Sequence, residues 1–201
     1  MVCELKILLA SSSPRRLDLI RELGWDFKVA NPTVVEDEES MNPVERVEVN
    51  ALRKARSIEG CQGYLIIGAD TVVFHEGEIL GKPGESGKAA MMLRKLSGKP
   101  HKVYTGVTIL NSDTGEMLTR HEETTVWFKE LDDETIETYV ATGEPLDKAG
   151  AYGIQGEAGA LVDRIEGSYS NVVGLPLELV REMLNKICEH KPANKKYPGI
   201  I

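Results

Sequence analysis

The sequence predicts an α/β fold, and three observations support this prediction. Short apolar runs typical of strands alternate along the chain with segments whose apolar residues recur at helical spacing. The helical segments begin near serine, asparagine or aspartate, and several end at glycine, as helices commonly do. Turn signals at residues 76–77 (Glu-Gly) and 113–115 (Asp-Thr-Gly) separate apolar runs, which is typical of hairpins. Strands and helices are therefore mixed, which favours an α/β class over an all-helical one.

The first predicted unit is a strand followed directly by a helix. Residues 5–10 form an apolar run, and residues 11–14 (Ser-Ser-Ser-Pro) start a helix, because serine caps helices and proline suits the first helical position. We expect Gly24 to stop this helix. A second strand is predicted at residues 25–30.

The second helix follows an acidic loop at residues 36–39. Residues 42–45 (Asn-Pro-Val-Glu) resemble a capping box, and apolar residues then recur at helical spacing as far as Ile58. Gly60 is the predicted stop. Lys54 lies one helical step from apolar positions, so it borders the buried face.

The central strand is predicted at residues 64–74, which are almost continuously apolar apart from residues 68–71 (Gly-Ala-Asp-Thr). Such a run is typical of a strand that is buried on both faces. A turn at residues 76–77 leads into a short partner strand at residues 78–80. The loop at residues 81–84 (Gly-Lys-Pro-Gly) comes next.

The remaining elements follow the same rules. Strands at 102–110 and 117–128 flank a turn, and the helix at 132–142 has an acidic first turn that suits the helix dipole. Residues 150–167 are rich in glycine and receive no strand or helix. The other two predicted helices are at 86–96 and 177–188.

Composition excludes several classes of protein. The chain has 201 residues and a net charge of −8, which suits one domain or two compact lobes and weighs against a binder of nucleic acid or of an anionic membrane. Cys3, Cys61 and Cys188 follow no metal-ligand or disulfide pattern. No signal peptide and no membrane-length apolar run is found, so we expect a cytoplasmic protein. The GxxxxGK[ST], GxGxxG and GxSxG motifs are also missing.

Asp70 is the first candidate functional residue. A lone carboxylate in so apolar a strand costs several kcal/mol unless it is paired. Three explanations remain open: Asp70 caps a turn, it forms a buried ion pair, or it binds a metal or acts as a base. Gly68 and Ala69 leave room for something to approach the backbone.

A set of cations accompanies this carboxylate. Arg15 and Arg16 lie in the first turn of a helix, where free N–H groups already attract phosphate and where two cations are unfavourable without an anion. Lys54, Lys82 and Glu36 are each ambiguous alone. Together they fit the hydrolysis of a triphosphate, which needs cations and metal around the phosphates and an activated water. Mg²⁺ prefers one or two carboxylates, which Asp70 and Glu36 can supply.

Six segments resemble signature sequences of the Maf family, and the resemblance as a whole extends from residue 7 to about residue 187. They are residues 9–16 (LASSSPRR), 68–71 (GADT), 80–83 (LGKP), 95–98 (KLSG), 147–156 (DKAGAYGIQG) and 173–176 (VGLP). The resemblance implies a mixed-sheet α/β fold like that of the inosine-triphosphate pyrophosphatases, with two lobes around a deep cleft. It also implies one domain over residues 1–190 and a C-terminal tail at 191–201, and it is compatible with a homodimer.

The resemblance further implies a nucleotide pyrophosphatase that uses a divalent cation, Mg²⁺, Mn²⁺ or Co²⁺. Asp70 would be the proton acceptor and, with Glu36, a metal ligand. Ser11, Arg16, Lys54 and Lys82 would bind the phosphates. One departure is that Val35 precedes Glu36, where the family often has two consecutive acidic residues.

Three further residues fall on positions that distinguish branches of the family: Arg15, Thr71 and Gln155. Their combination resembles the branch that hydrolyses dTTP and UTP. The amide of Gln155 has both a donor and an acceptor, so it can pair with the edge of a pyrimidine. Two alternatives stay open: a pyrophosphatase for 7-methyl-GTP or another modified nucleotide, and a nucleotide-binding regulator of septum formation.

Overall fold

The computed structural model describes residues 6–40 and 42–189, which form a seven-stranded mixed sheet in the order β2-β1-β3-β5-β6-β7, with β4 paired to β3. β1 runs parallel to β2 and β3, whereas all other pairs are antiparallel. The predicted α/β class and mixed sheet are confirmed. The strands are β1 Lys6–Ala10, β2 Phe27–Ala30, β3 Tyr64–His75, β4 Glu78–Leu80, β5 Pro100–Asn111, β6 Met117–Phe128 and β7 Val162–Glu166.

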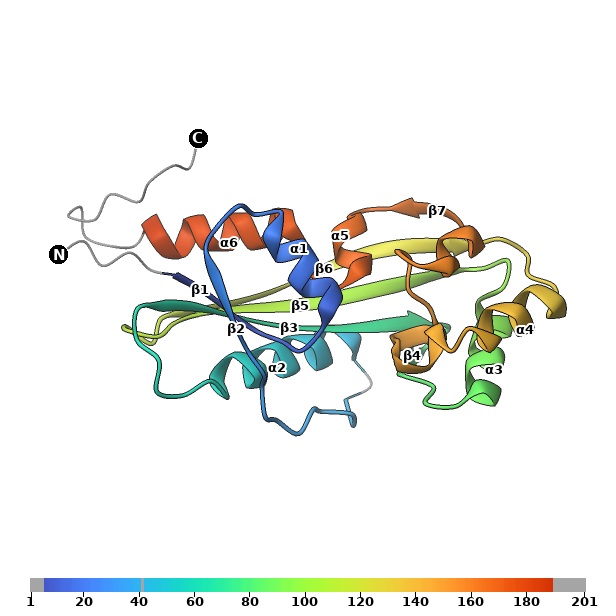
Figure 1. The fold of residues 1–201 in the computed structure, drawn as a ribbon, viewed down its shortest axis with the longest axis horizontal. Coiled ribbons are helices and arrows are strands. Elements are labelled where there is room, and N and C mark those ends of the chain that lie inside the picture. The colour runs from blue at the N-terminus through green and yellow to red at the C-terminus, as the bar shows by residue number, and fades with distance from the viewer. Residues whose placement is uncertain (1–5, 41, 190–201) are drawn as a thin grey trace.

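Helices cover both faces of this sheet. In Figure 1, α1 and α6 lie on one face and α2 lies on the other, while α3 and α4 pack together at one end. The long strands β3, β5 and β6 connect the two ends. The helices are α1 Pro14–Arg21, α2 Pro43–Arg56, α3 Ser86–Leu96, α4 Asp133–Ala141, α5 Tyr169–Val173 and α6 Leu177–Glu189, with 3-10 turns at Glu144–Asp147, Ala149–Ala151 and Glu157–Leu161.

The helix-start predictions are confirmed, with small shifts at the ends. Asn42 caps α2 by accepting hydrogen bonds from the backbone N–H groups of Val44 and Glu45. The reciprocal half of the predicted capping box is different, because the Glu45 carboxylate accepts a hydrogen bond from Ser40 instead. The helix ends at Arg56, so Ile58 lies beyond it, and α1 likewise ends at Arg21 before Gly24.

Two regular elements that the sequence did not reveal lie within the glycine-rich stretch and directly after it, β7 and α5. β7 lies at the edge of the sheet, pairs with β6, and has no fully buried residue. A strand without a buried face lacks the alternation that identifies strands. Helix α5 has five residues, which is too short for a helical period to show. Residue 5, Cys3 and the tail at 191–201 lie outside the described residues.

The apolar interior divides into two main clusters. One is formed by β1, β3 and β5 with α1 and α6, and includes Leu9, Ile67 and Met183. The other lies at the end of the sheet that carries α3 and α4, and includes Leu93 and Phe128. Within the described part of the chain, no helix is long and apolar enough to cross a membrane.

Two glycines let α2 pack unusually close to the sheet. A methyl group on Gly68 would lie 2.2 Å from the carbonyl oxygen of Ala51, and one on Gly106 would lie 2.3 Å from that of Val47. Both distances are shorter than van der Waals contact, so only glycine fits. The space predicted at Gly68 is thus filled by the backbone of α2. This close approach brings the side chains of α2 to Asp70, which pairs with Gly106 in the sheet.

Candidate active site

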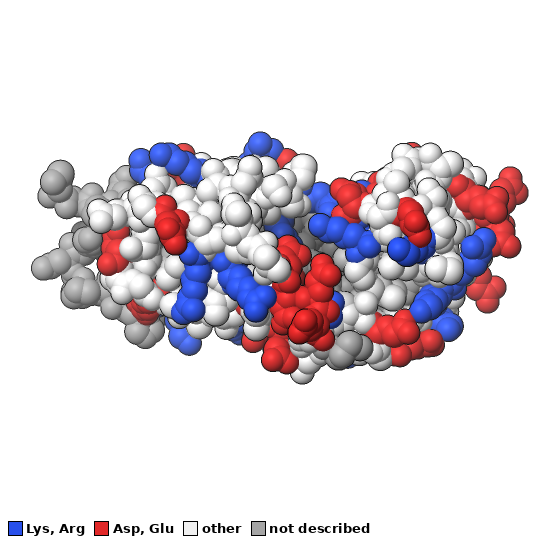
Figure 2. All heavy atoms as spheres, turned by 90° about the horizontal axis from the view of Figure 1, so that it is seen from below, with Lys and Arg blue, Asp and Glu red and all other residues white. Residues whose placement is uncertain are grey.

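A cavity of about 690 Å³ contains the residues that the sequence singled out. Its lining comes from the β1–α1 junction, the loop at residues 31–40, α2, β3, β4 and the loop after it, β5, residues 147–155 and α5. Figure 2 shows a hollow on this face with acidic and basic side chains at its margin. All nine predicted site residues line the cavity: Ser11, Arg15, Arg16, Glu36, Lys54, Asp70, Thr71, Lys82 and Gln155.

Lys54 joins the two predicted carboxylates. Its Nζ lies 2.6 Å from Asp70 Oδ1 and 2.7 Å from Glu36 Oε1. Lys54 is only 6% exposed and Asp70 only 7%, so their ion pair is largely shielded from water. Of the explanations for Asp70, the buried ion pair is therefore present. It leaves a catalytic role open, because Asp70 also lines the cavity.

Glu36 is held in its charged form. Burial acts to raise the pKa of Glu36, but the hydrogen bond and charge of Lys54, together with the charges of Lys82 and Arg16, outweigh this and lower it. Glu36 lies in the acidic loop and Asp70 in β3, so the two carboxylates reach Lys54 from different parts of the chain.

These carboxylates suit a divalent cation that is bound together with phosphate. Among residues 6–40 and 42–189, no group of three or more His, Cys, Asp or Glu gathers to hold a metal by itself. Mg²⁺ normally takes one or two carboxylates and fills its remaining positions with phosphate oxygens and water. Asp70 and Glu36 fit that requirement, since their oxygens converge on a common cation.

Arg16 is held in one orientation by the protein. Its Nε donates to the carbonyl oxygen of Gly174 at 2.7 Å, and its Nη2 donates to Thr71 Oγ1 at 3.0 Å. Burial lowers the pKa of Arg16, and the charge of Asp70 opposes this effect. An arginine remains protonated in proteins, so a fixed positive fork faces the cavity.

A chain of hydroxyl groups supports this arginine. Thr105 Oγ1 donates its single proton to the carbonyl oxygen of Asn171 at 3.1 Å. Thr71 lies 2.9 Å from Thr105 Oγ1 and must therefore be the donor in that pair. The hydroxyl proton of Thr71 is thus already used, and Thr71 accepts from Arg16. As a residue that reads the base, Thr71 stays a prediction.

The predicted specificity residue Gln155 lies on an exposed turn, and residues shortly before this turn are buried in the protein. Tyr152, three residues earlier, is buried and its hydroxyl lies 2.7 Å from His101 Nε2. Burial lowers the pKa of His101 to about 3, so the ring is neutral at physiological pH. This histidine is therefore structural.

Sequence reasoning missed three residues of this site. Asn50 donates a hydrogen bond to Asp70 Oδ2 at 3.1 Å, and Thr105 and Gly174 orient Arg16 as described. Asn50 had a usable signal, because it lies one helical turn before Lys54 on the same face of a helix. Thr105 had none, since a threonine in a strand is ordinary.

Comparison with known proteins places the chain in a family. The model of the Maf-like protein family matches residues 6–187. The chain is 50% identical over 183 residues to the dTTP/UTP pyrophosphatase of Pelotomaculum thermopropionicum, covering 90% of this chain and 96% of the relative. It is 51% identical over 185 residues to the dTTP/UTP pyrophosphatase of Symbiobacterium thermophilum, covering 90% and 93%.

The fold is also found in more distant proteins. The structure of the Ham1 protein of Staphylococcus aureus has a TM-score of 0.51 at 14% identity, covering 90% of this chain and 99% of that one. The Ham1 protein of Coxiella burnetii has a TM-score of 0.50 at 15% identity, with the same coverage. At such identities the similarity shows the fold alone. The family match and the close relatives together show that this chain belongs to the Maf-like protein family.

Proposed function

We propose that this protein hydrolyses dTTP and UTP to the nucleoside monophosphate and pyrophosphate. The observation that carries the proposal is the placement of Asp70: a buried carboxylate, paired with Lys54, at the wall of a cavity that Arg15, Arg16 and Lys82 also line. The activity named for the relatives at about half identity supports the same substrates.

The residues have separate roles in this proposal. Arg16, Lys54 and Lys82 bind the phosphates, together with Ser11, which lies just before the N-terminus of α1. Asp70 accepts a proton from the attacking water, whose oxygen bonds to the α-phosphorus. The bond between that phosphorus and the α–β bridging oxygen breaks, and pyrophosphate leaves with the electron pair. Throughout this reaction the positive charges of Arg16, Lys54 and Lys82 neutralise the phosphates, in place of mobile solvent.

Glu36 and Asp70 would hold the divalent cation, Mg²⁺, Mn²⁺ or Co²⁺. When bound, it would supply positive charge at the phosphate oxygens. The selection of the base is proposed to depend on Arg15, Thr71 and Gln155, with the amide of Gln155 as the group able to match both a donor and an acceptor of a pyrimidine.

A panel of nucleoside triphosphates tests this function. Purified protein with Mg²⁺ or Mn²⁺ is expected to release pyrophosphate fastest from dTTP and UTP. Preference for 7-methyl-GTP would instead support the modified-nucleotide alternative, and no release from any nucleotide by folded protein would refute the enzyme.

Asp70→Asn separates catalysis from binding. We expect the variant to lose turnover and still bind nucleotide, because the shape and the cations of the cavity remain. If an effect on cell division survived in Asp70→Asn, regulation would not require catalysis. The homodimer, the cytoplasmic location and the single domain over residues 1–190 stay predictions.

A further inference from the structure

We propose that Asn50 is a positioning residue, which holds the loop carrying Glu36 in register with Asp70. The inference rests on the proposed function, since it concerns the same two carboxylates. It assigns a role to a residue whose side chain binds the backbone of Asp37 and the carboxylate of Asp70.

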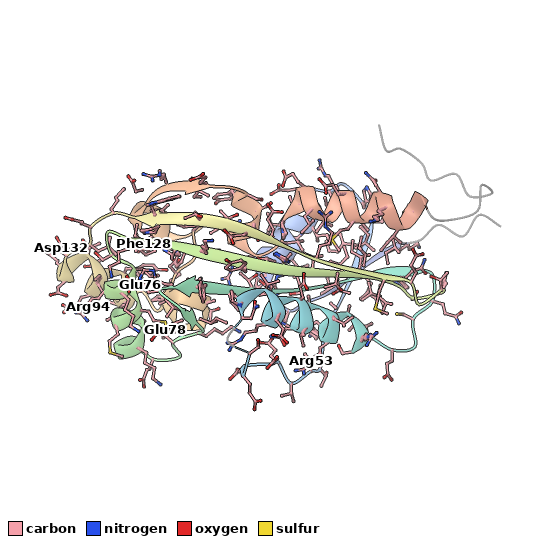
Figure 3. All side chains as sticks on the ribbon, turned by 180° about the vertical axis from the view of Figure 1, so that it is seen from behind. Arg53, Glu76, Glu78, Arg94, Phe128 and Asp132 are labelled. Carbon is pink, nitrogen blue, oxygen red and sulfur yellow. The ribbon has the colours of Figure 1, made fainter. Side chains whose placement is uncertain are left out.

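The loop at residues 31–40 is tied to α2 by hydrogen bonds. It contains no helix or strand, and side chains of α2 bind its backbone instead. Arg46 donates to the carbonyl oxygen of Ser40 at 2.6 and 2.9 Å, and Arg53 donates to that of Val35 at 3.3 Å. Figure 3 labels Arg53 on the side of α2 that faces this loop.

These side chains form one face of the helix. Positions 46, 50, 53 and 54 are spaced as i, i+4, i+7 and i+8, which places them on a single stripe. The stripe binds the loop at several points along its length. Only at Asn50 and Lys54 does the same side chain also reach Asp70.

The amide of Asn50 connects three groups at once. Its Oδ1 accepts from the backbone N–H of Asp37 at 2.6 Å, and its Nδ2 donates to the carbonyl oxygen of Asp37 at 3.1 Å. The second Nδ2 proton is donated to Asp70 Oδ2, also at 3.1 Å. Asn50 is 2% exposed, so water does not compete for these bonds.

The orientation of this amide is determined by its partners. The backbone N–H of Asp37 is a donor and must face the oxygen, so Nδ2 must face the carbonyl group and the carboxylate. Asp70 thus has one oxygen on Asn50 and the other on Lys54. Glu36 directly precedes Asp37. The hydrogen bonds between Asn50 and the backbone of Asp37 therefore determine where the Glu36 carboxylate lies relative to Asp70.

Asn50→Ala tests the role, with Asn111→Ala as the matched control. Asn111 is also fully buried and also binds backbone, accepting from Asp113 and Thr114 at 3.0 and 3.3 Å, but it does not line the cavity. Both variants lose buried hydrogen bonds, and both are expected to melt at lower temperature. Asn50→Leu repeats the test with the volume of the side chain nearly conserved.

Two measurements distinguish positioning from a merely structural role. The Mn²⁺ concentration that gives half-maximal hydrolysis is expected to rise about 10-fold or more in Asn50→Ala and Asn50→Leu, because groups that orient metal ligands have effects of this size. A smaller folded fraction would lower the maximal rate without moving that concentration. Independently of activity, amide hydrogen exchange at residues 34–40 is expected to accelerate in these variants and not in Asn111→Ala.

The outcomes separate this inference from the function it rests on. If the wild type hydrolyses dTTP and both Asn50 variants keep the wild-type Mn²⁺ midpoint and loop exchange, Asn50 does not position the loop. If Asn111→Ala shifts the Mn²⁺ midpoint equally, the effect is one of stability and the inference is also overturned. If the wild type hydrolyses no nucleotide, the proposed function fails, while hydrogen exchange still decides whether Asn50 holds the loop.

Discussion

Gly106→Ala is the most direct test of how the fold builds the site. The new methyl group would lie 2.3 Å from the Val47 carbonyl oxygen and 2.8 Å from the backbone nitrogen of Glu48, whereas ordinary contact begins at 3.4 Å. The obstacle is helix backbone, which cannot rotate away. Helix α2 must therefore move outward by about 1 Å, in a closely packed interior.

This displacement has a calculable effect on the site. Lys54 Nζ lies 2.6 Å from Asp70 Oδ1, so an outward shift of about 1 Å would stretch the contact to the limit of a hydrogen bond. Overpacking of this kind costs about 1–3 kcal/mol, and at this chain length each kcal/mol lowers the melting temperature by about 2–4 °C. A misplacement of about 1 Å at a catalytic centre can lower the rate by about 100-fold.

The assay compares rate and stability in the same protein preparation. Pyrophosphate release from dTTP gives the rate, and thermal unfolding by circular dichroism gives the melting temperature. Gly87→Ala is the control, because no atom lies within 4 Å of its added methyl group and alanine is the better helix former in α3. Wild-type rate and melting temperature in Gly106→Ala would refute the claim that close packing of α2 places Lys54.

The further predictions concern four polar side chains: Lys54, Thr71, Gln155 and His101. Lys54→Met leaves Asp70 as a buried carboxylate without its ion-pair partner. We therefore expect hydrolysis to be lost and the free energy of unfolding, measured by chemical denaturation, to fall by about 3–5 kcal/mol. Wild-type hydrolysis and wild-type unfolding free energy in this variant would contradict the buried ion pair. Thr71→Val removes the acceptor for Arg16, so kcat/KM should fall by about 10-fold or more for every nucleotide, since hydrogen bonds to charged groups contribute about 1.5–3 kcal/mol. The ratio of dTTP to CTP hydrolysis should also change in Gln155→Ala and in Thr71→Val; an unchanged ratio in Thr71→Val would show that Thr71 orients Arg16 without reading the base. His101 has a pKa of about 3 in the folded protein, against an ordinary value of 6.5. Between these two pH values the unfolded chain binds a proton at His101 that the folded protein does not bind. The neutral ring therefore contributes to stability fully above pH 6.5, and this contribution is lost as the pH falls toward 3. In His101→Gln, the slope of the unfolding free energy against pH should decrease between pH 3 and pH 6.5 by up to about 1.4 kcal/mol per pH unit. His121→Gln, at an exposed histidine, is the control. An unchanged slope in His101→Gln would refute a buried neutral ring.

The order of strands and helices was predictable from sequence wherever a local signal existed. The apolar run around Asp70, the Ser-Ser-Ser-Pro helix start and the Glu-Gly hairpin turn are each encoded within about a dozen residues. The nine predicted site residues also line one cavity. β7 and α5 were missed because an exposed edge strand and a five-residue helix have no periodicity to detect.

The chain by itself therefore determined its class, most of its elements and the types of residue available for chemistry. Only the tertiary structure decided which polar groups meet: Asn50 with Asp70, Thr105 with Thr71, and Gly174 with Arg16. The last pair is separated by 158 positions. Such contacts depend on how closely α2 approaches the sheet and on how strands align, and both are set by packing between distant segments, which no local pattern contains.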